Sequence, residues 1–234
     1  MKIIGILGGM SAASTQIYYN KLCAMTTARL GGLHSPDLII RSLDFSDIEE
    51  LQSQGEWIQA GERLNKEAKN LEACGAEVLV LATNTMHKLS DSMMKGVGIP
   101  MVHIADATAE AIVKSGLKSP GLMATKFTME HSFYTDRLAA SGLNPILPGV
   151  ANRQIIHDII YNELCLNIKT DSSERIFKEI ARNLVEEGAD SLILGCTEVC
   201  ILLDQDNVDV PVFDTTSIHC ESALNIALLD KDDE

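Results

Sequence analysis

The fold is decided by two similar stretches, AKNLEACGAEVLVLATNT (68–85) and ARNLVEEGADSLILGCTE (181–198). They align at a constant offset, which pairs Gly75 with Gly188 (188 − 75 = 113). Each stretch reads as the end of a helix, a glycine turn and a short apolar strand that leads into polar residues. The same succession of elements at two places in one chain predicts an α/β unit that occurs twice.

A second pair of stretches supports this repeat. GILGGMSAASTQIYYNKL (5–22) aligns with GLMATKFTMEHSFYTDRL (121–138) at an offset of 116, which places Tyr18 on Tyr134 (134 − 18 = 116). The two pairs follow each other in the same order. We therefore expect two homologous halves related by a pseudo-two-fold axis.

Short apolar runs alternate with longer amphipathic stretches along the whole chain. The apolar runs predict strands at 3–7, 37–43, 77–82, 100–104, 121–125 and 191–195. The amphipathic stretches predict helices near 12–29, 57–74, 105–116, 129–141, 151–165 and 172–187. Runs that are apolar on both faces are typical of a parallel sheet covered by helices, which binds ligands at the carboxyl ends of its strands. The fold class is therefore α/β, with two domains that each hold a short, mainly parallel sheet flanked by helices.

Thr83 and Cys196 occupy equivalent positions in the two copies, because 196 − 83 = 113. Each follows a predicted strand, so the pseudo-two-fold axis is expected to place them on opposite sides of one cleft. Inverting a carbon centre needs one group that removes a proton from one face and another that delivers a proton to the other face. The pKa of a free cysteine, about 8.5, can be lowered toward neutrality at a helix N-terminus. We therefore predict proton-transfer chemistry with Cys196 as the working acid/base.

Charge and hydropathy exclude several classes of partner. The chain has 33 acidic and 19 basic residues and a formal net charge of −14, whereas phosphate binding needs a basic face. No apolar run reaches the roughly 18 residues of a membrane span, and MKIIGILGGM reads as a first strand rather than a signal peptide. We expect a cytoplasmic protein that binds neither nucleic acid nor membrane, with a solvated acidic tail at residues 230–234.

The six cysteines show neither the spacing of a disulfide framework nor, together with histidines, that of a zinc site. We expect free thiols in a reducing compartment and no metal ligands. Cys196 differs from the others because Gly-Cys-Thr-Glu ends a strand inside the repeat. The other five are expected to be small structural thiols: Cys23, Cys74, Cys165, Cys200 and Cys220.

Two further features allow a functional and a structural interpretation. GILGGMS (5–11) lacks the spacing of a dinucleotide-binding or phosphate-binding loop. It reads as a tight turn whose backbone amides approach a small anion, or as a turn without a ligand. His87 stands four residues after Thr83, and either a structural or a functional histidine fits that place.

Taken together, these residues resemble the aspartate/glutamate racemase family over nearly the whole chain. Within the family, the chain most resembles the branch of bacterial amino-acid racemases that has the sequence TNTMHK at this place. The resemblance rests on GILGGMS (5–11), GGLHS (31–35), TNTMHK (83–88), HIADAT (103–108), TKFTME (125–130), GCTEV (195–199) and PVFDT (211–215).

The resemblance implies a pyridoxal-independent amino-acid racemase that needs no cofactor, takes a small amino-acid substrate and forms a homodimer. The first domain would comprise residues 1–98 and 213–234, the second residues 99–212, with the active site at their interface. Family roles carried onto matching positions make Cys196 and Thr83 the catalytic pair. They also imply that the substrate's α-carboxylate or ammonium is bound by the backbone around Met10 and by Asn84, Thr85, Thr125 and Thr197.

The chain departs from the family pattern at two places that affect activity. Thr83 replaces the first catalytic thiol, and an alcohol is a much weaker acid than a thiol. The Arg and Lys that many aspartate racemases use for the distal carboxylate are missing from the expected places. We expect Lys126 and Gln52 to bind the distal carboxylate in their place. We expect Cys196 to take the α-proton of L-aspartate or L-glutamate, and the Thr83 side to be slow with the D enantiomer.

Two other functions are compatible with a single thiol. One is a lyase of the same superfamily that decarboxylates a malonate-type substrate, because reprotonating an enolate needs no second base. The other is a catalytically impaired homologue that only binds an amino acid. Carbon dioxide release or tight binding without proton exchange would distinguish them from a racemase.

Overall fold

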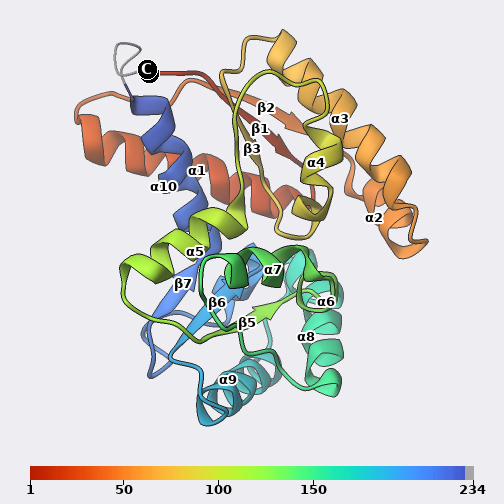
Figure 1. Cartoon of the computed structure of the whole chain (residues 1–234), viewed down its shortest axis with the longest axis vertical. Coiled ribbons are helices and arrows are strands. Elements are labelled where there is room, and N and C mark those ends of the chain that lie inside the picture. Colours follow the sequence, from red (N-terminus) through yellow and green to blue (C-terminus); the bar gives the residue numbers. More distant parts are fainter. Residues whose placement is uncertain (230–234) are drawn as a thin grey trace. The chain divides into compact units, whose positions relative to one another are not determined.

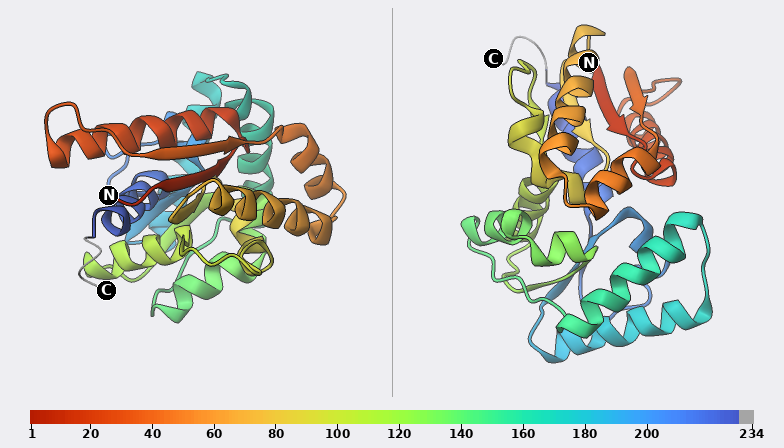
Figure 2. Two further views of the ribbon diagram at one scale, coloured as in Figure 1. Left: turned by 90° about the horizontal axis from the view of Figure 1, so that it is seen from above. Right: turned by 90° about the vertical axis from the view of Figure 1, so that its right-hand side faces the viewer.

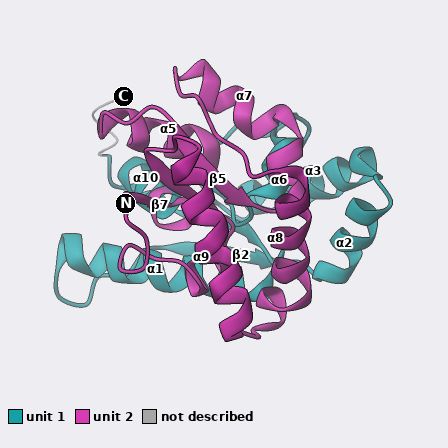
Figure 3. Cartoon of the chain, turned by 90° about the horizontal axis from the view of Figure 1, so that it is seen from below, with its two compact units in different colours: residues 1–103, 219–234 teal, residues 104–218 magenta. Residues whose placement is uncertain are grey.

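The computed structural model describes residues 1–229, so the acidic tail predicted to be solvated lies outside the described residues. The chain divides into two compact units (Figure 3). Unit 1 contains residues 1–103 together with the chain from residue 219, and unit 2 contains residues 104–218. This division differs from the domain boundaries expected from the sequence at residues 99–103 and 213–218.

Unit 1 is built on a parallel sheet with the strand order β2-β1-β3-β4. Helices α1 and α3 both contact β1, which is buried along its whole length (Figure 1). The strands are β1 (Ile4–Gly8), β2 (Leu38–Ser42), β3 (Val78–Leu81) and β4 (Met101–Val102). The helices are α1 (Ala12–Leu30), α2 (Phe45–Ser53), α3 (Trp57–Ala73), the 3₁₀ helix η1 (Thr85–Leu89), α4 (Ser90–Met93) and most of α10 (Thr215–Leu228).

Unit 2 has a parallel sheet with the order β5-β6-β7. A single bridge between Gly121 of β5 and Ile146 stands where β2 pairs with β1 in unit 1. The strands are β5 (Pro120–Ala124), β6 (Ser191–Gly195) and β7 (Val212–Asp214). The helices are α5 (Ile104–Lys114), α6 (Lys126–Glu130), α7 (Ser132–Ala140), α8 (Val150–Asn162), η2 (Leu164–Leu166), α9 (Asp171–Glu186) and η3 (Thr197–Ile201). Helices α8 and α9 lie side by side (Figure 2).

The repeat read from the sequence is present in the fold, and close packing explains one of its glycines. A Cβ atom added to Gly5 would lie 2.7 Å from Ala76 Cβ and 3.5 Å from Leu71 Cβ. At the equivalent Gly121, an added Cβ would meet the side chains of the equivalent residues, Leu184 at 3.2 Å and Ala189 at 3.3 Å. Both copies therefore use a glycine to bring the first strand against the helix–turn–strand that follows it.

The turn before β3 in unit 1 is also the same as the turn before β6 in unit 2. Gly75 and Gly188 have φ values of +101° and +104°, in the region that favours glycine. The amide of the next residue donates to the carbonyl of a leucine in the preceding helix, from Ala76 to Leu71 in unit 1 and equivalently in unit 2. A glycine that ends a helix in this way is a common C-terminal capping motif.

The helix that follows the last strand of each unit belongs to the other unit. Helix α5 follows β4 of unit 1 but contacts β7 in unit 2, whereas α10 follows β7 but belongs to unit 1 from His219 onward. The equivalent buried tyrosines anchor both helices. Tyr18 Oη lies 2.8 Å from Nδ1 of His219, and Tyr134 Oη lies 3.5 Å from Oγ1 of Thr108.

The observed elements differ from the predicted ones in three respects. The helix predicted at 129–141 is interrupted, because His131 is extended (φ −92°, ψ 134°) between α6 and α7. Helices α2 and α10 were not predicted, since α2 is short and α10 has no clear amphipathic period. Strand β2 is not buried on both faces, because it forms the edge of the sheet.

Candidate functional site

Thr83 and Cys196 stand at equivalent positions beyond the carboxyl ends of equivalent strands. Leu81 of β3 pairs with Leu7, and Leu194 of β6 pairs with Met123, so both offsets of the sequence repeat recur in the strand register. Thr83 and Cys196 each follow two residues after these paired leucines. The carboxyl end of a parallel strand is where α/β proteins bind their ligands.

In unit 2, the thiol of Cys196 has a carboxylate beside it. Its Sγ donates to Oε2 of Glu198 at 3.0 Å, and a second thiol, Cys165, lies 3.9 Å from the other carboxylate oxygen. Glu198 is 3% exposed. A buried carboxylate between two thiols can accept a proton from either of them.

The electrostatic surroundings of Cys196 are the opposite of those expected from the sequence. Burial, the negative charge of Glu198 and the neighbouring Cys165 raise the pKa of Cys196 well above its usual value. The helix after Cys196 is a five-residue 3₁₀ helix with Glu198 in its first turn, so it offers little compensating positive potential. Cys196 is therefore a thiol, not a thiolate, when no ligand is bound. Burial and Glu198 likewise raise the pKa of Cys165 to about 12.

In unit 1, Thr83 lacks a comparable partner. It is 9% exposed, and its amide donates to the carbonyl of Leu81 at 2.9 Å. Its hydroxyl makes no hydrogen bond within residues 1–229. The two equivalent side chains thus differ in chemistry, because within the described residues the Cys196 thiol has an acid/base group at hydrogen-bonding distance and the Thr83 hydroxyl does not.

Three buried histidines gather behind Thr83 in unit 1. Nδ1 of His87 lies 2.7 Å from the carbonyl oxygen of Thr83. The ring of His87 makes edge contacts with His103 and His219, at centroid distances of 4.7 and 5.4 Å. His219 also bonds the carbonyl of Val102 through Nε2, at 2.8 Å. The sequence indicated His87 only through its spacing from Thr83, and the cluster involves residues that are far apart along the chain.

The other predicted binding residues of unit 1 are buried around the same strand ends. Asn84 and Thr85 begin the 3₁₀ helix η1 and are 5% and 4% exposed. Met10 lies in the turn after β1, the strand that pairs with β3, and is 6% exposed. Gln52 is 3% exposed on α2.

The turn after β1 uses part of its hydrogen-bonding capacity internally. The Gly9 amide donates to the hydroxyl of Thr15 at 2.7 Å, and the Ser14 amide donates to Oγ of Ser11 at 3.1 Å. The Ser11 hydroxyl thereby caps helix α1, and the Gly9 amide is occupied, so the anion expected at GILGGMS has fewer amides available than the motif suggested.

In unit 2, Thr125 and Cys196 follow directly after the paired strand residues Ala124 and Gly195, so the structure brings them to the same edge of the sheet. Thr125 caps α6 by accepting from the amide of Thr128. Thr197, the residue after Cys196, is 5% exposed.

The ammonium of Lys126 is turned toward helix α8. It donates to Oε1 of Gln154 at 2.8 Å, and Gln154 in turn donates to Asp158. Any binding of a substrate carboxylate by Lys126 therefore competes with this contact.

Sequence reasoning missed two residues that the structure makes candidates. Glu198 belongs to the Gly-Cys-Thr-Glu motif, and its position two residues after Cys196 in a tight turn was the available signal. Lys88 holds its ammonium 3.9 Å from the centroid of the Trp57 ring, and burial lowers its pKa. Residues three apart in a 3₁₀ helix lie on the same face, which groups Lys88 with Thr85.

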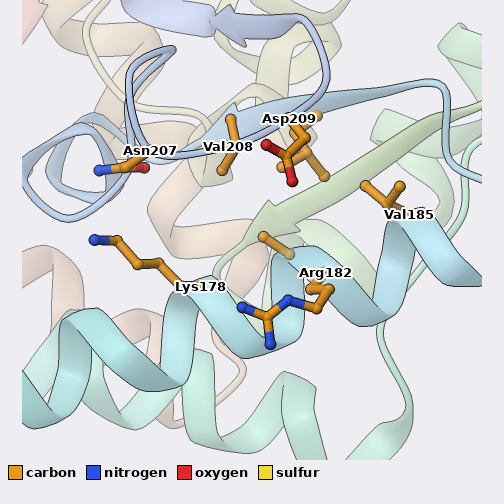
Figure 4. A pocket seen from close by; sticks show the side chains of 8 residues that line it. Lys178, Arg182, Val185, Asn207, Val208 and Asp209 are labelled. Atoms are coloured by element: carbon orange, nitrogen blue, oxygen red, sulfur yellow. The ribbon is translucent and has the colours of Figure 1, made fainter.

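A pocket in unit 2 lies away from these residues. Lys178 extends from α9 toward Asn207 (Figure 4), and Leu192 is among the residues that line the pocket. Leu192 is near the start of β6, whereas Cys196 follows the end of that strand. Two of the polar side chains that line the pocket are engaged, because Lys178 pairs with Glu174 at 2.7 Å and Asn207 bonds its own loop.

Within residues 1–229, no group of three or more His, Cys, Asp or Glu side chains has the arrangement of a metal site. None of the helices in the described part of the chain is both long and apolar enough to cross a membrane.

Similar proteins of known structure identify the class. A crystal structure of a candidate Asp/Glu racemase from Yersinia pestis is 43% identical, with a TM-score of 0.91 over 98% of this chain and all of that one (100%). The structure of an aspartate racemase homologue from Pyrococcus horikoshii OT3 is 35% identical, with a TM-score of 0.84 over 97% of this chain and 99% of that one. The fold and these similarities define a two-unit α/β isomerase, an amino-acid racemase.

The chain belongs to the Asp/Glu/hydantoin racemase family, whose model matches residues 7–223. The broad specificity amino-acid racemase RacX of Bacillus subtilis (strain 168) is 22% identical over 97% of this chain and 98% of its own length. Arylmalonate decarboxylase shares the fold, with 17% identity and a TM-score of 0.54 over 97% of this chain and 93% of that one.

Proposed function

We propose that the protein racemises aspartate or glutamate without a cofactor, with Cys196 acting on the L enantiomer and Thr83 serving the opposite face. The observation that carries this proposal is the Cys196–Glu198 pair, a thiol with a carboxylate 3.0 Å away at a buried strand end. The family and the repeat supply the second position, Thr83, at the equivalent strand end. The proposal requires both residues to act on one substrate molecule.

The thiol must first lose its proton. In the proposed first step, the S–H proton of Cys196 moves to the Glu198 carboxylate, leaving a thiolate and a carboxylic acid. The positive ammonium of an arriving amino acid favours this transfer, because it stabilises the thiolate against the burial that raises the pKa of Cys196. Without that charge the site stays protonated.

The thiolate then removes the α-proton of the L substrate. The C–H bond breaks, an S–H bond forms and the electron pair remains on the α-carbon as a carbanion delocalised into the carboxylate. A solvent-derived proton, relayed on the Thr83 side, forms the new C–H bond on the opposite face, and Glu198 returns its proton to solvent, which restores the starting state. Because the Thr83 hydroxyl has no base beside it among the described residues, we expect the reverse reaction to start slowly from the D enantiomer.

An acidic substrate also needs a partner for its distal carboxylate. Lys126 and Gln52 are the proposed partners from the sequence, and Asn84, Thr85, Thr125 and Thr197 are proposed to hold the α-carboxylate and ammonium together with the backbone around Met10. Lys88 is a further candidate for binding the distal carboxylate, because burial lowers the pKa of its ammonium and a neighbouring carboxylate would stabilise the charged form.

We also propose that the protein is a cytoplasmic homodimer. Light scattering after gel filtration can test the oligomeric state.

The test is α-proton exchange in D₂O. Each of L-aspartate, L-glutamate and their D forms is incubated separately with the protein, the α-proton is followed by NMR, and the enantiomers are separated by chiral chromatography. We expect deuterium to enter the L substrates and some D product to form. Markedly faster entry from the D enantiomers would overturn the assignment of Cys196 to the L face.

A matched pair of variants identifies the thiol. Cys196→Ser should lower exchange by about 10²- to 10⁴-fold, the usual contribution of a positioned acid/base group. Cys165→Ser removes the other thiol that contacts Glu198 and should retain exchange, because Cys165 lies in η2 and not at the strand end equivalent to Thr83. No exchange with any of the four substrates would end the proposal.

A lyase is the second candidate, and the isolated hydroxyl of Thr83 is the observation that favours it. A decarboxylase needs only one proton donor, and Cys196 is protonated in the unliganded protein. Release of carbon dioxide from an arylmalonate, abolished in Cys196→Ser, would establish this function. Aspartate binding without either reaction would instead indicate a binding protein.

A further inference from the structure

His87 is bonded to the backbone of the residue that replaces the usual thiol. Its Nδ1 lies 2.7 Å from the Thr83 carbonyl oxygen, which closes a loop over Asn84 and Thr85. His87 is 1% exposed, and the backbone amide of His87 donates to Asn84 as well, at 3.2 Å. The side chain therefore holds the turn that carries three predicted site residues.

The hydrogen bond fixes the tautomer of His87. A carbonyl oxygen only accepts, so Nδ1 must carry the proton. Burial lowers the pKa of His87 well below its usual value, and His103 and His219 lower it further. The ring is therefore neutral, and Nε2 is a buried lone pair without a hydrogen-bond partner among the described residues.

The groups that face His87 come from several elements of unit 1. His103 follows β4, and His219 lies on α10, where it accepts from the hydroxyl of Tyr18 on α1 and donates to Val102. A proton added to Nε2 of His87 would create a buried positive charge beside two imidazoles, and no carboxylate is among the causes of its pKa shift. The cluster thus keeps the His87 ring neutral. In this form Nδ1 is the one donor of the ring, and it donates to the Thr83 carbonyl.

We propose that His87 is a positioning residue for Thr83. The neutral imidazole of His87 holds the Thr83 carbonyl and so orients the hydroxyl that serves the second face of the substrate. This inference rests on the proposed racemisation. It assigns His87 to one half of the reaction only, because His87 is bonded to Thr83 in unit 1, whereas Cys196 is bonded to Glu198 in unit 2.

The two halves can be measured separately in one experiment. When an L substrate is incubated in D₂O, deuterium that enters with retained configuration needs only the Cys196 side. Formation of the D enantiomer needs the Thr83 side as well. The ratio of D product to deuterated L substrate therefore reports on the Thr83 side and is insensitive to a general loss of active protein.

Three variants test the role of the Nδ1 donor. His87→Leu removes the donor, whereas His87→Asn retains an amide N–H close to the place of Nδ1 and cannot titrate. The exposed His34, changed to Asn, is the control for a remote histidine. Misplacement of a reacting group by about 1 Å costs up to about 100-fold, so we expect His87→Leu to lower the ratio by about 10- to 100-fold and His87→Asn by less than about threefold.

The pH profile separates positioning from proton transfer by His87 itself. A proton added to Nε2 would leave the Nδ1 donor and its bond to the Thr83 carbonyl in place, so we expect the ratio to have the same pH dependence in the wild type and in His87→Asn. An acid limb present in the wild type and absent from His87→Asn would overturn the positioning role. An unchanged ratio in His87→Leu, or equal losses in the Leu and Asn variants, would overturn this inference while leaving the racemase intact. Absence of deuterium entry in the wild type would overturn the proposed function and this inference with it.

Discussion

The chemistry of the two equivalent strand ends is decided by single residues. Cys196 has Glu198 at 3.0 Å, whereas the hydroxyl of Thr83 has no such neighbour within residues 1–229. A carboxylate next to a thiol has two opposing effects. It offers a place for the proton to go, and its negative charge makes the thiolate harder to form. Under the proposed mechanism, ionisation of Cys196 depends on a positive charge that the substrate brings.

These opposing effects predict an unusual response to Glu198→Gln. A neutral amide removes one of the causes that raise the pKa of Cys196, so the rising limb of the pH profile for deuterium entry into L-aspartate should move to lower pH. The maximal rate should fall, because the proton acceptor is lost. The ultraviolet absorbance of the thiolate, measured against Cys196→Ser, gives the pKa directly. A limb that stays in place or moves to higher pH would contradict the role of Glu198.

Sequence reasoning at this scale reached the positions but not the contacts. The constant offset of 113 identified Thr83 and Cys196 as equivalent, and the strand register reproduces that offset. The predicted shift of the Cys196 pKa had the wrong sign, because the direction in which the Glu198 side chain points is set by a tight turn. The contact between Lys126 and Gln154 joins residues far apart in the chain, which no local pattern reveals.

At the scale of elements, the first strand of each unit makes equivalent close contacts, β1 with the end of α3 and the turn after it, and β5 with the end of α9 and the turn after it. The strands and most helices could be predicted, because apolar runs and amphipathic periods are local signals. Helix α10 could not, because its apolar residues surround the whole helix and include Ala223, Leu224 and Ala227, which are completely buried. Its place is determined by tertiary packing rather than by its own pattern.

The equivalent glycines predict unequal effects of the same substitution. In Gly5→Ala the new methyl would lie 2.7 Å from the Cβ of Ala76, which only a backbone movement can relieve. In Gly121→Ala the nearest atom is the end of the Leu192 side chain at 2.9 Å, which can rotate away. We expect Gly5→Ala to lower the free energy of unfolding by about 1–3 kcal/mol, and Gly121→Ala by less.

Urea unfolding measures this difference, and a double variant provides its control. Adding Ala76→Gly to Gly5→Ala removes the clash, so the two substitutions together should destabilise less than the sum of each alone. Equal effects of Gly5→Ala and Gly121→Ala, or strict additivity of the pair, would show that the contact is not limiting.

At the scale of the whole molecule, stability in acid is expected to depend on histidines that are buried without charge. Burial lowers the pKa of His219 from 6.5 to about 4. In the unfolded chain the histidine binds its proton near pH 6.5, so its contribution is fully present above that pH and is lost as the pH falls toward 4. The shift of about 2.5 units corresponds to roughly 3 kcal/mol, and His87 adds to it in the same direction.

The measurement is the urea midpoint as a function of pH between 7.5 and about 5, a range above the ordinary titration of most carboxylates. The wild type should lose stability steadily as the pH falls. His219→Gln should be less stable at neutral pH, but its midpoint should change less with pH. A wild-type midpoint that stays constant over this range would contradict the prediction.

The exchange of helices between the units has a consequence for how such a chain can be divided. Helix α5 follows β4 yet packs on β7, and α10 follows β7 yet reaches β4 through His219 and Val102. A protein made of one repeat alone would lack the helix that completes its own sheet. Two copies could complete each other by trading these helices, which is the arrangement of a domain-swapped homodimer. Cutting the connection between the repeats would therefore produce complementary fragments, as in a split protein, rather than two self-sufficient domains.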